Sequence, residues 1–209
     1  MSEVESRLIA TTVHGQVLSS GPTAAEWLLI GLHGYGMTAA SMYTSLLEIS
    51  LPQEPRRVAV QALHAFMGKV EPGYSWMTCD LREQRISENR AYLEQVLQLE
   101  RSHGKRLAWC GFSQGASMAY RAAAWFGGDA LVINGGDIPP ELSKTALAAL
   151  PTTIIGAGDT DQFMTPSRLD ADGEKLSAAG VNLTRTRFDG GHAWTRAWSA
   201  QVSDWLQSL

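Results

Sequence analysis

The pentapeptide GFSQG, residues 111–115, is the part of the sequence where catalytic chemistry is easiest to recognise. The run RLAWC before it is typical of a strand, and the alanine-rich run QGASMAYRAAAW after it is typical of a helix. A serine in G-x-S-x-G on such a strand–turn–helix unit is held in a strained conformation at the end of the strand. The glycines keep the crowded strand and helix from colliding. We therefore predict that Ser113 is a nucleophile.

A serine hydroxyl needs a neighbouring base near neutral pH, and the base needs an acid that orients it. After a turn of this kind, the three groups follow the chain in the order serine, acid, histidine. Of the five histidines of the chain, only His192 follows Ser113. It lies in FDGGHAW, a glycine-rich loop after the last predicted strand. This order predicts that His192 is the base.

The segment GDTD, which follows the penultimate predicted strand, offers two aspartates as the orienting acid. We expect Asp161 to take this role, because it begins the run toward Pro166. Asp159 is the alternative, and whichever aspartate is not the orienter is expected to cap the turn with its side chain. Asp137, in NGGDIPP after the preceding strand, is a third candidate, and otherwise a turn residue.

Acyl transfer also needs N–H donors for the oxyanion that forms on the substrate. In this kind of site one donor is the backbone N–H of the residue after the nucleophile, here Gln114. The other comes from the loop after an early strand. The segment GLHGYG, residues 31–36, can turn at its glycines and present the N–H of Tyr35. His33 in the same loop is expected to be a structural brace.

The elements that must position these groups alternate along the chain. Buried strands are predicted over Glu26–Leu32, Arg57–Leu63, Arg106–Cys110, Ala130–Asn134, Thr152–Gly156 and Asn182–Phe188. Helices are predicted over Thr38–Glu48, Leu81–Ser102, Gln114–Phe126, Pro166–Ala179 and Trp194–Leu206. Such alternation indicates a mostly parallel, doubly wound sheet with helices on both faces.

Two further segments complete this prediction. The first 20 residues alternate weakly in hydropathy and predict a short β-hairpin around Gly15. The longest irregular stretch is Ala65–Asp80, which leaves no room for a large cap domain. We therefore expect one α/β domain over residues 1–209.

Composition and charge exclude several classes of partner. The net charge is −4, and no cluster of Lys and Arg is longer than a pair, so nucleic acid is not expected to bind. The start, MSEVESRLIA, lacks the features of a signal peptide, and no apolar run is long enough to span a membrane. Cys79 and Cys110 are too few for a disulfide framework or a metal site. These features predict a reduced, cytoplasmic protein.

GLHGYG, GFSQG, GDTD and GGHAW, in this order over most of the chain, resemble the motifs of the phospholipase/carboxylesterase family of α/β hydrolases. That family includes the acyl-protein thioesterases and small bacterial carboxylesterases. The resemblance implies an α/β-hydrolase fold. It also implies a triad of Ser113, Asp161 and His192, with the backbone N–H groups of Tyr35 and Gln114 at the oxyanion.

The same resemblance implies a small-molecule ester or thioester substrate, cleaved through an acyl-enzyme by a carboxylesterase, acyl thioesterase or lysophospholipase. No metal or organic cofactor is expected. Two alternatives stay open: a catalytically silent fold used for binding, and a peptidase or lactone hydrolase with the same triad. The oligomeric state stays open as well, a homodimer included.

Large apolar side chains flank the predicted catalytic loops and are candidates for a substrate pocket. They are Trp76, Met77, Phe163, Met164 and Trp194. For Trp194 the alternative is a core position, because it lies one turn before the stripe of Trp198, Val202 and Trp205 in the last predicted helix.

Overall fold

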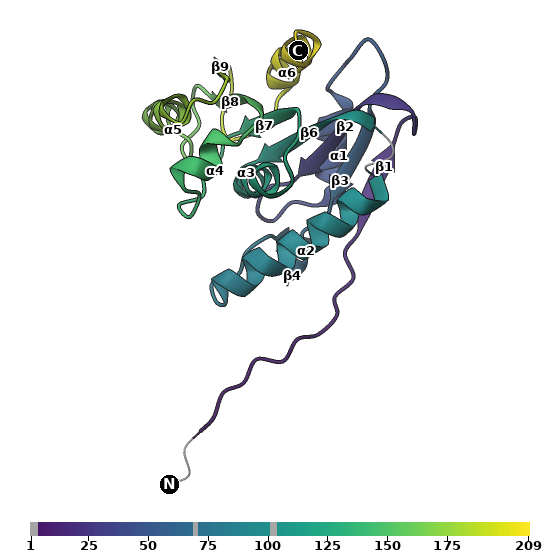
Figure 1. Cartoon of the computed structure of the whole chain (residues 1–209), viewed down its shortest axis with the longest axis vertical. Helices are drawn as coiled ribbons and strands as arrows, with labels where there is room; N and C mark the ends of the chain where they lie inside the picture. The colour runs from purple at the N-terminus through teal and green to yellow at the C-terminus, as the bar shows by residue number, and fades with distance from the viewer. Residues whose placement is uncertain (1–3, 69–70, 101–103) are drawn as a thin grey trace.

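A seven-stranded sheet forms the centre of the computed structural model, which describes residues 4–68, 71–100 and 104–209 (Figure 1). The strand order is β1-β3-β2-β6-β7-β8-β9, and β1 alone among these pairs antiparallel with its neighbour. The strands are β1 (Val17–Ser20), β2 (Ala25–Leu32), β3 (Arg56–Val60), β6 (Gly104–Phe112), β7 (Ala130–Asn134), β8 (Thr152–Gly158) and β9 (Leu183–Phe188).

Helices cover both faces of this sheet. On one face lie α1 (Ala39–Leu47) and α6 (Arg196–Gln207), and on the other lie α2 (Arg82–Glu100), α3 (Gln114–Phe126), α4 (Lys144–Ala148) and α5 (Pro166–Ala178). Alternate side chains of each strand enter the two cores, as Leu28 and Leu29 of β2 do. The predicted fold class, a mostly parallel α/β-hydrolase sheet with helices on both faces, is confirmed.

The predicted elements of the central sheet all form, with small shifts at their ends. Strand β6 is longer than predicted and α6 begins later, after Thr195 caps it. The predicted end of the long helix at 101–102 lies outside the described residues, and α2 is described to Glu100. None of the helices within the described ranges is long and apolar enough to cross a membrane.

Two predictions about the connections were wrong. The N-terminal segment forms no hairpin around Gly15, since residues 4–16 have no secondary structure and β1 instead pairs with β3. The stretch predicted as irregular holds a hairpin of β4 (His64–Met67) and β5 (Pro72–Ser75). The pairing of a strand depends on contacts with another segment, and hydropathy along the chain does not specify that segment.

The carboxyl ends of the parallel strands meet at one edge of the sheet, where the loops of an open α/β sheet form binding sites. The loop after β2 leads into α1, whose far end is tied to β3 by Arg57. Its buried guanidinium donates from Nε to Leu46 O at 3.0 Å and from Nη2 to Ile49 O at 3.0 Å. The helix that follows this loop is thus fixed at its C-terminal end by a strand.

Replacing Arg57 with Met should lower the free energy of unfolding by about 1–3 kcal/mol, because Ile49 O would lose its side-chain donor and Leu46 O would keep only its backbone donors. Urea unfolding followed by tryptophan fluorescence would measure this. The same substitution at Arg196, whose side chain is 93% exposed, is the matched control and should have little effect. Equal midpoints for both variants would contradict the role of Arg57.

Candidate active site

The turn between β6 and α3 holds Ser113 in a backbone conformation that L-residues rarely adopt. Its φ is 54° and its ψ is −119°. Its N–H donates to Asn134 O at 2.9 Å, which ties the turn to the end of the neighbouring strand β7. Such outliers persist where the surrounding structure enforces them, and they are common at active sites.

The two glycines of the pentapeptide are required by close backbone contacts. A Cβ at Gly111 would lie 2.5 Å from Gly115 O, and one at Gly115 would lie 2.0 Å from Leu32 O. Neither contact can be relieved by moving a side chain, because the obstructing atoms belong to the backbone. The spacing G-x-S-x-G therefore follows from how tightly α3 begins against β2 and β6.

Three side chains far apart in the sequence form a chain of hydrogen bonds at this turn. His192 Nε2 lies 2.8 Å from Ser113 Oγ, and His192 Nδ1 lies 2.8 Å from Asp161 Oδ2. Because a carboxylate only accepts, Nδ1 carries the proton and Nε2 is free to accept from the serine hydroxyl. The Asp161 side chain is 1% exposed and the His192 side chain 20%. This is the arrangement in which an imidazole can act as a base.

The second oxygen of Asp161 is also fully engaged. Oδ1 accepts the N–H of Phe163 at 2.8 Å and of Met164 at 2.9 Å. The carboxylate is thus fixed in place by its own turn while it faces His192. Of the two aspartates in GDTD, the residue that contacts the histidine also makes the capping contact that we expected from the other.

The other two candidate acids lie in surface ion pairs. Asp159 pairs with Arg187 at 2.7 Å, and about half of its side chain is exposed. Asp137 pairs with Arg168. Burial raises the pKa of Asp137, and the nearby Arg168 opposes this effect. In this structure neither carboxylate is bonded to the imidazole.

The two predicted oxyanion donors belong to two different turns that both adjoin Ser113. Gln114 is the first residue of α3, and N–H groups in the first turn of a helix have no acceptor within it. Tyr35 lies in the turn between β2 and α1. A Cβ at Gly34 would be 3.2 Å from Ser113 Cβ, so this turn packs directly against the nucleophile.

His33 braces that turn, as expected, and takes no part in the chain at Ser113. Its Nδ1–H donates to Gly34 O at 2.8 Å, while its Nε2 accepts from Ala62 N at 3.1 Å and from the Gln61 amide at 3.0 Å. Burial lowers the pKa of His33 more than the bond to Gly34 raises it, which favours this neutral form. The carbonyl that it holds belongs to the same peptide group as the Tyr35 N–H.

The segment NGGD, residues 134–137, contributes residues that the sequence analysis missed. A Cβ at Gly135 would lie 3.2 Å from both Asp161 Oδ2 and His192 Nδ1, and its φ is +63°. Asn134 accepts from Ser113 N and donates from its side chain to Ala193 O at 3.1 Å. The signal that the sequence offers for these residues is the pair of glycines after a buried strand.

Two of the residues expected in a substrate pocket are buried, and a third is partly buried against the core. Trp76 and Met164 are 0% and 1% exposed and belong to the hydrophobic core. The Trp76 indole N–H donates to His33 O at 2.8 Å, so it stabilises the turn that carries Tyr35 from the core side. Trp194 packs edge-on against Trp198, which makes it a continuation of the core stripe.

The other two candidates lie at the site. The Phe163 ring is 64% exposed and lies 4.7 Å from the His192 ring, between centroids. Met77 lines a cavity of about 490 Å³ beside the nucleophile turn. Eight of its thirteen lining residues are charged or polar and five are apolar: Arg82, Gln114, Ser117, Arg121, Asp137, Arg168, Asp172 and Lys175, with Met77, Ile138, Pro139, Pro140 and Ala171.

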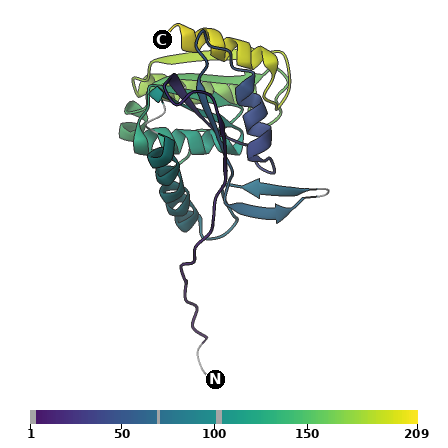
Figure 2. The same ribbon diagram turned by 90° about the vertical axis from the view of Figure 1, so that its right-hand side faces the viewer.

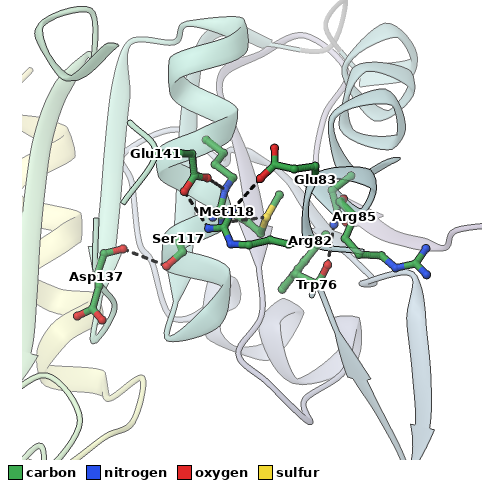
Figure 3. A network of polar contacts seen from close by, with 10 residues as sticks. Trp76, Arg82, Glu83, Arg85, Ser117, Met118, Asp137 and Glu141 are labelled. Carbon is green, nitrogen blue, oxygen red and sulfur yellow. Dashed lines mark hydrogen bonds and ion pairs between the residues drawn. The ribbon is translucent and has the colours of Figure 1, made fainter. Parts of the chain in front are cut away.

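A network of ion pairs fixes the charged wall of this cavity (Figure 3). Glu141 accepts from Arg121 Nε at 2.6 Å and from Arg82 Nη2 at 2.9 Å, so it joins α3 to the start of α2. Burial acts to raise the pKa of Glu141, but the hydrogen bonds from the two arginines hold it below its usual value. Ser117 donates to Asp137 O at 3.0 Å, as Figure 3 shows.

Comparison with known proteins agrees with this architecture. The model of the dienelactone hydrolase family matches residues 27–204. The esterase PE8 superposes with a TM-score of 0.76 at 23% identity, covering 95% of this chain and 99% of that one. The Zea mays acyl-protein thioesterase 2 gives a TM-score of 0.72 at 20% identity over 93% and 99% of the two chains.

The Bacillus cereus carboxylesterase gives a TM-score of 0.71 at 15% identity, covering 93% of this chain and 94% of that one. No curated protein sequence matched the chain. The resemblance to the phospholipase/carboxylesterase type of α/β hydrolase is confirmed at the level of the fold, and the family model that matches is that of the dienelactone hydrolases.

Replacing Asp161 with Asn should lower the rate at which Ser113 reacts with a fluorophosphonate probe, because an amide would favour the wrong imidazole tautomer. The loss expected for such a change is on the order of 10⁴-fold. Asp159→Asn is the matched control two residues away and should react at nearly the normal rate. The time course of probe labelling measures both, and a slower reaction in the Asp159 variant alone would reverse the assignment.

Proposed function

Because the chain belongs to the dienelactone hydrolase family of α/β hydrolases, we propose that it hydrolyses carboxylic esters or thioesters through an acyl-enzyme on Ser113. One observation carries this proposal: the hydrogen-bonded chain from Ser113 through His192 to Asp161, with both links at 2.8 Å. An activated serine needs this geometry, whereas a fold used only for binding has no need of it.

In the proposed reaction, Ser113 Oγ attacks the carbonyl carbon of the ester while its proton passes to His192 Nε2. The backbone N–H groups of Tyr35 and Gln114 bind the oxyanion, and one such donor is worth roughly 3 kcal/mol. The imidazolium then protonates the leaving alcohol or thiol, and the acyl-enzyme forms. Water then attacks the acyl carbon as its proton passes to His192 Nε2, the bond from the acyl carbon to Ser113 Oγ breaks, and the imidazolium returns the proton to Oγ as the acid leaves. Asp161 accepts the hydrogen bond from His192 Nδ1–H throughout the reaction and stabilises the imidazolium.

A lactone hydrolase is the second candidate, and membership of the dienelactone hydrolase family favours it. The chemistry is the same on a cyclic ester, except that the alcohol stays attached to the acyl group after ring opening. The triad geometry supports both candidates equally. A comparison of rates on a small lactone and on an open-chain ester of the same size would distinguish them.

The cavity beside the nucleophile supports a small and polar substrate. Four of its lining side chains are cationic and two are anionic: Arg82, Arg121, Arg168, Lys175, Asp137 and Asp172. A long acyl chain placed there would bury apolar surface against charged groups and desolvate them, which is unfavourable. A cytoplasmic location and a small-molecule partner complete the proposal.

Replacing Ser113 with Ala should lower esterase turnover by on the order of a millionfold, because the three groups act as a unit. Hydrolysis of p-nitrophenyl acetate and labelling by a fluorophosphonate probe would measure this. Ser177→Ala, at an exposed position of α5 outside the cavity, is the control and should keep the activity. Normal turnover in the Ser113 variant would contradict the proposed nucleophile.

A series of p-nitrophenyl esters from acetate to laurate should show rates that fall as the acyl chain lengthens. The physical reason is that a long acyl chain would cover the charged side chains of the cavity wall and remove them from water, which is unfavourable. The measurement is kcat/KM for each ester below its solubility limit. Equal rates for all chain lengths, or a maximum at laurate, would contradict a short, polar substrate.

A further inference from the structure

The hairpin of β4 and β5 forms a small sheet of its own and projects from the body of the molecule (Figure 2). An isolated two-stranded hairpin is marginally stable in water, so its position depends on contacts with the rest of the chain. These contacts are made with the two turns that carry the proposed oxyanion donors.

The first contact is with the turn of Tyr35. The Tyr35 and Phe66 rings stack with 4.9 Å between centroids and 17° between planes. Gly36 N–H donates to Tyr74 O at 2.9 Å, across the same contact. A Cβ at Gly73 would lie 2.8 Å from the Phe66 ring and 3.1 Å from Gly36 Cα, so the hairpin fits tightly against the turn.

The second contact is with the nucleophile turn. The Gln114 side chain accepts from Trp76 N at 2.9 Å through Oε1, and its Nε2 donates to Ser75 Oγ at 3.0 Å. Ser75 closes the hairpin, and its hydroxyl also lies 2.5 Å from Met77 O. The root of the hairpin is therefore bonded to the residue whose N–H is the other proposed donor.

We infer that this hairpin sets the position of both oxyanion donors, and that Phe66 is the positioning residue for the Tyr35 N–H. The inference rests on the proposed function. Tyr35 is 62% exposed and lies between two glycines, so the backbone of its own turn restricts its position little. On the buried side, His33 bonds the carbonyl of the peptide between Gly34 and Tyr35. On the exposed side, the Phe66 ring stacks on the Tyr35 side chain. The oxyanion exists only after Oγ has attacked, so this positioning acts on the transition state more than on substrate binding.

Phe66→Ala should lower kcat for p-nitrophenyl acetate by about 10- to 100-fold, the loss that a misplacement of about 1 Å produces, with KM nearly unchanged. Phe66→Tyr keeps a ring and should restore kcat. Phe66→Leu keeps apolar volume without a ring and should fall between the two. Met67→Ala changes the next residue, which is 88% exposed on the opposite face, and should behave as the unmodified chain.

A second readout separates positioning from general loss of structure. Phenylboronic acid forms a tetrahedral adduct with an activated serine and occupies the oxyanion site. Its inhibition constant should rise in Phe66→Ala by about the same factor as kcat falls, while thermal melting shows the body of the protein still folded. If Phe66→Ala melts early, the same comparison is made with Phe66→Leu.

Three outcomes would overturn the inference: normal kcat in both Phe66→Ala and Phe66→Leu, a loss confined to KM, or an equal loss in Met67→Ala. A loss confined to KM would make Phe66 a substrate contact. The proposed function fails by a different observation, the absence of ester hydrolysis and probe labelling in the unmodified chain. The two failures are therefore distinguishable.

Discussion

The close approach of α3 to the ends of β2 and β6 is the constraint on which the site depends. Gly115 lies so near Leu32 O that any side chain there would overlap the backbone. This packing forces the chain to turn within one residue, and Ser113 takes the strained conformation that results. The strain is maintained by the sheet and the helix together, since neither element alone would impose it.

The parallel sheet converts this local constraint into a site. Loops after β2, β6, β7, β8 and β9 all leave the same edge, so the turn of Tyr35, Ser113, the glycines after Asn134, Asp161 and His192 meet there. Each loop contributes little by itself. The His192 imidazole lies between the Ser113 hydroxyl and the Asp161 carboxylate. Gly135 has no side chain, and this leaves room for the imidazole. Catalytic groups on separate loops thus gain precision from one rigid layer beneath them.

The periphery of the site differs in character from its centre. The centre is held by backbone contacts and short hydrogen bonds, whereas one wall is a network of arginines and carboxylates around Glu141. Another part is the projecting hairpin of β4 and β5, which stacks the Phe66 ring on Tyr35. Variation in such peripheral parts changes which substrates an α/β hydrolase accepts while the reacting groups stay in place.

The sequence by itself determined the alternation of strands and helices, the place of the nucleophile turn, and the single histidine able to follow it. These features depend on local periodicity, glycine spacing and chain order, all of which can be read directly from the sequence. Tertiary structure decided which aspartate faces the histidine, because Asp159 and Asp161 differ only in their partners across the loop. It also decided that Trp76 and Met164 are buried, that residues 64–75 pair as a hairpin, and that Gly135 lies against the imidazole. Each of these is a contact between segments distant in sequence, and no local pattern specifies the partner.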